Sequence, residues 1–482
     1  MGGALSEAVT PAVAEAGALG LESPPLFPNT YRSWVLALLM IVYTSNFVDR
    51  TIVAILGQAI KVDMKISDAQ LGLLGGIAFA VLYTTLGIPI ARLAERRNRV
   101  TIISICLTIW SGMTALCGLA ANFPLLMLCR VGVGVGEAGC SPSAQSLIAD
   151  YYAPEKRATA LSIYSFGIPL GSMIGAVSGG LMAQYFGWRA AFMIVGLPGV
   201  LLAILVKLTL KEPPRGLSEP GGARLAAPAP SLWTVAKQLF GAPSFRHMAA
   251  GVTLVSFAGY GIGQFSAPYF VRRFGLSYAE VGLVFGLIGG ISSGLGTVLG
   301  GYVTDRAGRT DRRWYAWTPA IGVAIAAPIY LAAYLQESWI AAAAILLAPG
   351  IFGYTYLGPT WGVMHNLVEP RARASATALL FFGLNLIALG GGPFFTGLAI
   401  DLFSQHLFQA QGLGDFATLC PGGVAVHASL SQACHATLAT GTRYGIVLTM
   451  IAYVWGALHY LLASRRIRQD LDAAATRMAA AT

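Results

Sequence analysis

Residues 301–309 read G-Y-V-T-D-R-A-G-R, and residues 91–99 read A-R-L-A-E-R-R-N-R. In both stretches an acidic residue is followed by arginines, directly after a long apolar segment. A second pair of stretches recurs in the same order, P-E-K-R-A-T-A-L at 154–161 and P-R-A-R-A-S-A-T-A at 370–378. The two offsets, 210 and 216 residues, are nearly equal. The sequence therefore indicates that one structural unit has been duplicated, as in many secondary transporters.

The apolar segments around these motifs are long enough to cross a bilayer, which needs about 20 apolar residues per helix. Twelve segments qualify: 33–58, 69–92, 100–121, 124–149, 158–183, 188–210, 245–271, 279–303, 315–336, 339–365, 374–402 and 443–463. Six of them precede the connection 211–243 and six follow it. We therefore expect an all-α polytopic membrane protein with 12 transmembrane helices in two six-helix pseudo-symmetric bundles, and a substrate held between them.

The composition supports a membrane protein and excludes several classes of soluble protein. Only 11% of the residues are charged and 56% are apolar, whereas a soluble domain has about 25% charged residues. This excludes a water-soluble enzyme, a disordered chain and a nucleic-acid binder, despite the net charge of +10. We find no P-loop, no G-x-S-x-G elbow and no metal-binding C-x-x-C, so we expect no enzyme, no ATP-driven pump, no cofactor and no metal.

The basic residues indicate how the chain is oriented. With the N-terminus inside, 22 Lys and Arg residues fall on the cytoplasmic side and 6 on the opposite side, so both termini are expected to be cytoplasmic. The absence of an N-x-S/T acceptor favours a bacterial plasma membrane. We expect five parts: a disordered cytoplasmic tail at 1–30 that is not a signal peptide, a first bundle at 31–210, a cytoplasmic linker at 211–243, a second bundle at 244–464 with an outer connection at 403–442, and a cytoplasmic tail at 465–482.

The linker ends in S-L-W-T-V-A-K-Q-L-F at 231–240. Its periodicity fits either a short helix lying on the membrane or an extended start of the next helix.

Several motifs resemble those of a known family. The 301–309 stretch matches in full the loop motif of the major facilitator superfamily, whereas the 91–99 copy departs from it at Ala91, Glu95 and Asn98. The first half also carries motifs similar to those of the spinster family: N-F-V-D-R (46–50), I-S-D-A-Q-L-G-L-L (66–74), C-R-V-G-V-G-V-G-E-A-G-C-S-P (129–142) and L-S-I-Y-S-F-G-I-P-L-G-S (161–172). The resemblance implies a major facilitator fold and a transporter that moves a lysophospholipid or sphingolipid-like amphiphile. Transport in this family is commonly coupled to protons.

Four charged residues lie deep inside predicted spans, well away from the span ends, where a charge costs several kcal/mol. Asp49 and Arg50 lie in the first helix, and Arg130 and Glu137 lie in the fourth. Arg130, Gly134, Glu137 and Ser141 follow i, i+4, i+7, i+11 spacing and share one face. A buried acid binds a proton when a neighbouring guanidinium moves away, so these residues are expected to couple protons, with Asp49 favoured as the carrier. The alternative is that Asp49–Arg130 and Glu137–Arg50 are fixed structural pairs.

Polar and aromatic side chains in the spans are the candidates for substrate binding. They are Asn46, Arg50, Arg130, Glu137, Ser141, Tyr260, Gln264, Tyr356, Trp361, Phe382 and Asn385. The charges lie in the first half and the aromatics in the second, which suits a charged headgroup and an apolar tail. The alternative for each aromatic residue is ordinary packing.

The repeated loop motifs are expected to form a cytoplasmic gate. A carboxylate there is attracted by the N-terminal dipole of a neighbouring helix and by nearby arginines. The candidate residues are Glu95, Arg96, Arg157, Asp305, Arg306, Arg309 and Arg373. The alternative is a simple positively charged loop.

Cys420 and Cys434 lie in the predicted outer connection, where a disulfide between them is plausible because that side is oxidising. The expected partners are a lipid-like substrate, protons and the bilayer, with no nucleic acid, and the protein is expected to be a monomer. Two other functions stay open. The first is a transporter of small organic anions or drugs, in which Arg50 and Arg130 bind a carboxylate. The second is a membrane sensor that binds its ligand without moving it.

Overall fold

The computed structural model describes residues 27–215, 217, 230–369 and 372–480. Within these residues the chain is helical and has no strand, and eleven helical stretches are long and apolar enough to cross a membrane. The longest stretch, Thr159–Thr209, is interrupted at Gly187, whose φ of 80° and ψ of 163° are not helical. Because that stretch turns back on itself, it crosses twice, and the predicted twelve-helix fold is confirmed. The predicted tail at 1–30 lies mostly outside the described residues.

The N-terminal half of the fold consists of the helices before the linker. Three of its spans each combine two consecutive helices: α3 with α4, α6 with α7, and α8 with the first part of α9. The part of α9 after Gly187 forms the sixth span. The helices are α2 (Asn29–Met64), α3 (Asp68–Gly75), α4 (Ile77–Arg96), α5 (Arg99–Cys117), α6 (Phe123–Glu137), α7 (Cys140–Tyr151), α8 (Pro154–Ser165) and α9 (Gly167–Thr209).

The C-terminal half follows the linker and contains the same number of spans. A π-helix, η3, interrupts the eleventh span, as is common where membrane helices are irregular. The elements are α10 (Leu232–Gly241), α11 (Pro243–Phe274), α12 (Tyr278–Gly308), α13 (Trp314–Tyr334), α14 (Trp339–Gly353), η1 (Tyr354–Tyr356), α15 (Leu357–Asn366), α16 (Arg373–Leu384), η3 (Asn385–Gly390), α17 (Gly391–Ala410), α18 (Phe416–Leu419), η4 (Pro421–Gly423), η5 (Ala428–Leu430), α19 (Ser431–Thr449), α20 (Ile451–Ser464) and α21 (Ile467–Ala480).

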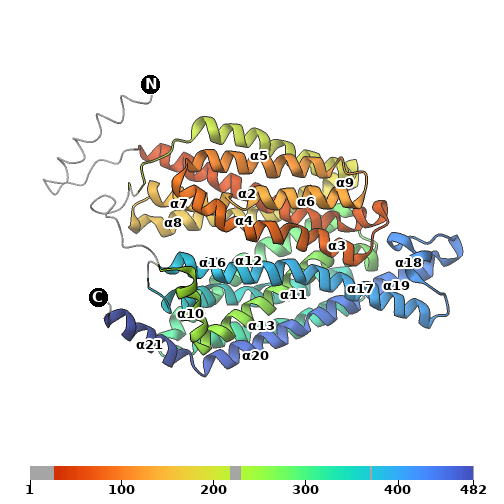
Figure 1. Cartoon of the computed structure of the whole chain (residues 1–482). Coiled ribbons are helices and arrows are strands. Elements are labelled where there is room, and N and C mark those ends of the chain that lie inside the picture. Colours follow the sequence, from red (N-terminus) through yellow and green to blue (C-terminus); the bar gives the residue numbers. More distant parts are fainter. Residues whose placement is uncertain (1–26, 216, 218–229, 370–371, 481–482) are drawn as a thin grey trace.

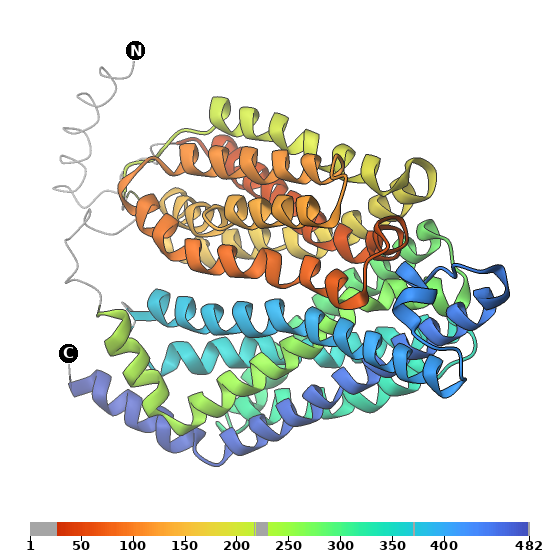
Figure 2. The ribbon, with the colours of Figure 1, turned by 45° about the vertical axis from the view of Figure 1, so that its right-hand side comes forward.

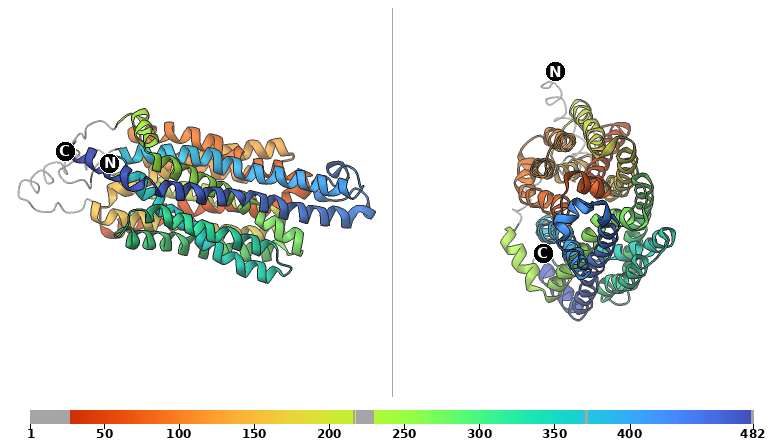
Figure 3. Two further views of the ribbon diagram at one scale, coloured as in Figure 1. Left: turned by 90° about the horizontal axis from the view of Figure 1, so that it is seen from below. Right: turned by 90° about the vertical axis from the view of Figure 1, so that its right-hand side faces the viewer.

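The two halves lie side by side, and their long helices run along one common direction (Figures 1 and 3). We call the end that carries α10 and α21 the terminal end, and the end that carries α18 and the segment 411–430 the loop end. In Figure 2 the ribbons of the halves meet near the loop end and diverge toward the terminal end. The ion pairs that join the halves, described below, lie at the loop end.

The same turn connects the first and second helices of each half. Lys65 caps the C-terminus of α2 and Gly275 caps that of α11, both in the left-handed conformation (φ 52° and 68°). Ser67 and Ser277 then cap the next helix through a complete capping box. These positions are also 210 residues apart, so the duplication extends to a third pair of stretches. They are I-S-D-A-Q-L-G-L-L at 66–74 and L-S-Y-A-E-V-G-L-V at 276–284.

Glycines allow the halves to touch at the backbone near the loop end. A Cβ atom on Gly180 of α9 would lie 2.3 Å from the carbonyl oxygen of Tyr278 at the start of α12. A Cβ atom on Gly72 of α3 would lie 2.2 Å from the carbonyl oxygen of Pro393 in α17. Small residues permit this close approach between membrane helices. The two halves are therefore packed tightly against each other at this end.

Helices extend further into the segment 403–442 than its hydropathy suggests. α17 continues to Ala410 and α19 already begins at Ser431. The first turns of α19 contain Gln432 and His435, which are too polar for a membrane span but compatible with a helix that projects beyond the bilayer.

In the linker, α10 is a separate helix with Trp233 80% exposed and Val235 buried, which agrees with the helical alternative for this segment.

The structure joins Cys420 to Cys434 by a disulfide, with the two Cα atoms 5.8 Å apart. The bond ties the end of α18 to the first turn of α19. Both cysteines are buried in the core of the C-terminal half. The bond therefore fixes the connection 411–430 onto the end of α19.

Replacing both Cys420 and Cys434 by Ser is expected to loosen this connection. Closing a loop of about 15 residues contributes about 3 kcal/mol in the chain-entropy model, so protease sites within 411–430 should be cut much faster in the variant. Limited proteolysis of unreduced protein in detergent measures this, with the same double change at Cys106 and Cys140, which are free and buried, as the control. Two free thiols at 420 and 434 in unreduced parent protein would contradict the bond.

Candidate functional site

The four predicted membrane charges come together between α2 and α6. Arg130 Nη1 lies 3.2 Å from Asp49 Oδ1, and Arg50 Nε lies 2.8 Å from Glu137 Oε2. Asp49, Arg130 and Glu137 are each at most 2% exposed. The pairing is crossed, since each helix supplies one acid and one arginine. The charges therefore neutralise one another inside the N-terminal half.

Each ion pair leaves polar atoms that nothing else in the described residues satisfies. Glu137 Oε1 and Arg130 Nε are buried and have no hydrogen-bond partner there. Asp49 is better satisfied, because the hydroxyl of Thr114 in α5 donates a hydrogen bond to Oδ2. The unsatisfied oxygen gives Glu137 an open position at which a proton or a ligand donor can bind.

Aromatic rings of α4 hold both guanidinium groups in place. The Arg50 guanidinium carbon lies 4.7 Å from the ring centroids of Phe79 and Tyr83, and that of Arg130 lies 5.9 Å from the Phe79 centroid. Such cation–π contacts are stronger in desolvated surroundings. Phe79 reaches this position because Gly134 of α6 leaves room for its backbone, since a Cβ atom there would lie 2.6 Å from the Phe79 carbonyl oxygen.

The fourth span is not one continuous helix. α6 ends at Glu137, a turn at Ala138 and Gly139 follows, and α7 begins at Cys140. Arg130, Gly134 and Glu137 of the predicted shared face lie in α6, whereas Ser141 lies in α7, beyond the turn. Ser141 is half-buried in the first turn of α7.

The remaining substrate candidates divide into two groups. Asn46 is 3% exposed and Gln264 is 7% exposed, and neither Oδ1 of Asn46 nor Nε2 of Gln264 has a hydrogen-bond partner in the described part of the chain. Tyr260 of α11 lies within electrostatic range of Arg50, across the boundary between the halves. Asn385 lies at the start of η3, which packs against α4. Gln264 and Tyr260 therefore approach the N-terminal half, and Asn385 belongs to an element that packs against it, whereas Asn46 is a buried residue of α2 within that half.

The other candidates pack within the C-terminal half. The hydroxyl of Tyr356 lies 3.0 Å from Ser256 Oγ. The ring of Trp361 lies 4.8 Å from that of Phe381, and Phe382 is 39% exposed. These contacts are those of a packed aromatic layer. The structure does not bring Tyr356 or Trp361 to the ion pairs of the N-terminal half.

The predicted gate residues lie at the terminal end, where the hydrogen bonds that Arg157 and Arg373 donate to backbone carbonyls each stay within one half. Asp305, Arg306 and Arg309 are exposed. Arg157 donates to the Ala149 carbonyl at 2.9 Å, and Arg373 to the His365 carbonyl at 3.4 Å. Arg96 is exposed, and the side chain of Glu95 lies outside the described part of the structure. The gate stays a prediction for an arrangement in which this end is closed.

A second charged cluster, not foreseen from the sequence, joins the halves at the loop end. Asp68 of α3 is fully buried and pairs with Lys61 of α2 at 3.1 Å and with Arg272 of α11 at 2.6 Å. Arg272 also donates to Gln58 at 2.6 Å. Asp401 of α17 accepts from the amides of residues 68 and 69 at 2.9 and 2.8 Å. We call Gln58, Lys61, Asp68, Arg272 and Asp401 the loop-end cluster.

This cluster was missed because its charges come from the ends of helices, which solvent normally surrounds. The signal available in the sequence was the S-D-A-Q capping pattern at 67–70, which places Asp68 in the first turn of a helix. Its burial depends on α17, far away in the chain. The cluster closes the loop end and leaves the terminal end as the side on which the halves are not joined.

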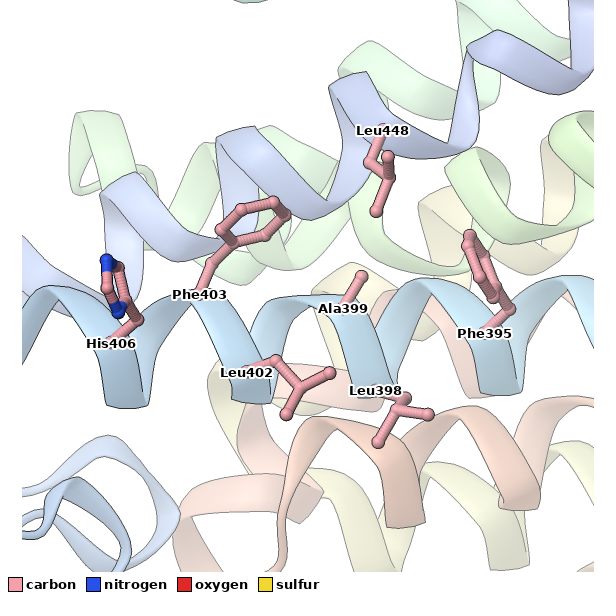
Figure 4. A pocket seen from close by; sticks show the side chains of 7 residues that line it. All are labelled: Phe395, Leu398, Ala399, Leu402, Phe403, His406 and Leu448. Atoms are coloured by element: carbon pink, nitrogen blue, oxygen red, sulfur yellow. The ribbon is translucent and has the colours of Figure 1, made fainter.

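A separate apolar pocket of about 340 Å³ lies between α17 and α19 (Figure 4). Apart from His406, its lining side chains are apolar, and they include Phe395, Leu402 and Leu448. None of the predicted site residues lines it. Its position therefore sets it apart from the charged site.

Comparison with known proteins shows the family. The model of the Major Facilitator Superfamily matches residues 39–408. The chain belongs to the Major Facilitator Superfamily. Within it, the chain is 32% identical over 450 residues to an MFS-type efflux pump of Mycolicibacterium smegmatis, covering 91% of this chain and 94% of the relative. It is 30% identical to the protein spinster homolog 1 of Mus musculus over 403 residues, covering 79% and 75%.

Solved structures agree with this assignment. A bacterial homolog of the human lysosomal transporter Spinster in an inward-facing, unoccupied conformation superposes with a TM-score of 0.85 at 36% identity, covering 92% of this chain and 99% of the homolog. The occupied inward-facing form gives 0.83. The protein is therefore a spinster-like secondary transporter and not an enzyme.

Removing the carboxylate at the centre of the loop-end cluster is expected to destabilise this arrangement. Asp68→Asn removes the carboxylate with which Arg272 and Lys61 form their ion pairs, and breaking a buried ion pair costs about 3–5 kcal/mol. The matched control is Asp63→Asn, which removes the exposed partner of Arg189 at the same end and should cost less than about 1 kcal/mol. Thermal unfolding in detergent compares the two variants. Equal melting temperatures would show that the cluster does not hold the halves together.

Proposed function

We propose that this transporter moves a lysophospholipid or sphingolipid-like amphiphile by proton-coupled alternating access in a bacterial plasma membrane, with both termini in the cytoplasm. The observation that carries the proposal is the crossed set of ion pairs, Asp49–Arg130 and Arg50–Glu137, buried in the N-terminal half. The spinster-like motifs of the first half support the substrate class. The excess of basic residues in the connections at the terminal end supports the orientation.

The ion pairs can link proton binding to a change of partner. A carboxylate that loses its guanidinium in a low-dielectric interior is strongly disfavoured, so it binds a proton instead. Arginine stays charged in both states. The free Oε1 of Glu137 accepts a proton without first losing a hydrogen bond. Since the two pairs share two helices, the acids titrate as one coupled set.

An anionic headgroup can compete for Arg50. The Arg50 side chain is 22% exposed, whereas that of Glu137 is 0% exposed, so a ligand can reach the guanidinium from the boundary between the halves. Phe79 and Tyr83 keep the guanidinium in place when Glu137 releases it. A phosphate that binds Arg50 would displace Glu137, and the displaced acid would bind a proton. Headgroup binding and proton binding are thereby linked.

The distribution of charge between the halves favours an amphiphile. Among the described residues, the ion pairs of the C-terminal half lie at helix ends and in connections, as with Arg273–Glu337 and Arg312–Asp472. The middle of that half presents aromatic and aliphatic side chains, including Tyr260, Phe381 and Phe382. A headgroup bound by Arg50 would place its apolar tail against these residues.

A transporter of small organic anions or drugs is the second candidate. It is favoured by the mycobacterial relative named as an efflux pump, and Arg50 and Arg130 would then bind a carboxylate. A sensor that binds ligand without moving it would show no flux at all. The three functions therefore differ in what crosses the membrane.

Reconstitution into liposomes with an imposed pH gradient separates these functions. The proposal expects the gradient to drive net movement of lysophospholipids or sphingoid phosphates, and a collapsed gradient to abolish that movement. Small aromatic carboxylates and cationic dyes of matched concentration serve as the comparison panel. Movement of the small anions alone would favour the second candidate, and binding without flux would favour the sensor.

Neutral variants at the two acids are expected to remove the pH response of the conformational equilibrium. Asp49→Asn and Glu137→Gln keep the shape but remove the titrating group. A distance probe between α4 and α16 at the terminal end, titrated from about pH 4 to 9, should show a transition in the parent that is shifted in each variant and lost in the double variant. Asp63→Asn, an exposed acid outside the site, is the control. An unchanged pH response in the double variant would make these carboxylates structural.

The orientation is tested by labelling single cysteines. Arg96 and Arg309 are exposed at the terminal end. The single-cysteine variants Arg96→Cys and Arg309→Cys should react with a membrane-impermeant maleimide only in inside-out vesicles. A cysteine at Glu337, which is exposed near the loop end with its side chain 85% accessible, should react only in right-side-out vesicles. The reverse pattern would invert the orientation.

A further inference from the structure

A polar pocket of about 410 Å³ lies at the loop end of the C-terminal half, beside the loop-end cluster, which contributes Arg272 to its lining. It is bounded by the last turn of α11, the connection between α13 and α14, and the first turns of α19. The charged and polar residues of its lining are Arg272, Arg273, Glu337, Gln432, His435 and Arg443.

α19 provides one complete wall of this pocket. Gln432, His435, Ala439 and Arg443 are spaced by three, four and four residues, so they form a single stripe on the helix. The stripe is about 16 Å long at 1.5 Å per residue. Arg443 lies at its inner end, next to Thr442, whose hydroxyl accepts a hydrogen bond from Arg272 at 2.8 Å. The inner end of the pocket is therefore level with the last turn of α11.

The three arginines of the pocket differ in how well they are satisfied. Arg272 is saturated by the loop-end cluster. Arg273 pairs with Glu337 at 2.9 Å, in contact with solvent. Arg443 has no carboxylate within ion-pair distance among the described residues, and its Nε atom is buried without a hydrogen-bond partner there. A buried, unpaired donor on a guanidinium is costly unless an acceptor fills the position.

The charges of the pocket lining favour binding of an anion. Three guanidinium groups and one carboxylate line the pocket, and the carboxylate already has a partner. Guanidinium forks match the oxygens of phosphate in geometry and charge. The pocket also lies where membrane-spanning helices end, which is the depth of the phosphate groups of a bilayer.

We propose that this pocket binds a phosphate monoester or diester, held by Arg443 and Arg273, at a site separate from the transport pathway. The phosphate of a phospholipid headgroup and a soluble phosphate ester share this chemistry. The Gln432 and His435 side chains at the outer end of the stripe provide further polar groups to the rest of the headgroup. The site does not depend on which substrate the transporter moves.

The test measures ligand-dependent stability of the full-length protein in detergent. Phosphatidylglycerol is titrated against diacylglycerol with the same acyl chains, which differs only in lacking the phosphoglycerol group. A second series uses soluble glycerol phosphate. We expect a saturable rise in melting temperature with phosphatidylglycerol and not with diacylglycerol. A rise with glycerol phosphate as well would identify the phosphate ester itself as sufficient, and its absence would identify the membrane lipid as the source.

Two variants localise the effect. Arg443→Gln removes a charge that has no acidic partner, so it leaves no buried acid unpaired, and it should weaken phosphatidylglycerol binding about tenfold, the loss of one charge-assisted contact. Arg189→Gln removes an arginine from an exposed ion pair at the same end, outside the pocket, and should leave binding unchanged. No stabilisation by either phosphate ligand, or equal affinities for the parent and Arg443→Gln, would overturn the proposal.

Discussion

A charge inside a bilayer must be neutralised by a neighbour, and this constraint organises the whole molecule. Two of the charged clusters in the described structure bear on transport. One lies within the N-terminal half, where Asp49 and Glu137 each pair with an arginine from the other helix. The second joins the halves at the loop end, where Asp68 binds both Lys61 and Arg272. The first cluster can change its protonation without moving the halves, and the second can separate only when they move.

This division suggests how the transporter works as a whole. The loop-end cluster and the glycine contacts beside it hold one end closed, while the predicted gate residues at the other end remain apart. Opening the loop end would expose Asp68 and Arg272 to water, which lowers the cost of separating them. Closing the terminal end would bring Asp305 and its neighbours toward the other half. The proposed binding of a proton to Glu137 and of a headgroup to Arg50 takes place between these two ends and would favour one arrangement over the other.

The sequence predicted the features that depend on local patterns. Twelve spans and a duplication follow from hydropathy and short motifs, and the depth of Asp49 and Glu137 identified them as unusual. It could not predict the aromatic support from Phe79 and Tyr83, because aromatics four residues apart in a membrane helix are usually in contact with lipid or other helices. It also missed the role of Asp68. The burial of Asp68 depends on α17, which lies more than 300 residues away in the chain. Asp401 of α17 accepts a hydrogen bond from the backbone amide of Asp68.

The most direct test of the account measures protons rather than substrate. A lysophospholipid is added to one side of proteoliposomes that contain a trapped pH indicator and have no imposed gradient. If substrate and proton binding are linked through Asp49 and Glu137, substrate movement must carry protons, so the internal pH should change in the parent and stay constant in the Asp49→Asn/Glu137→Gln variant. Substrate flux with no pH change in the parent would contradict proton coupling, even if transport itself were efficient.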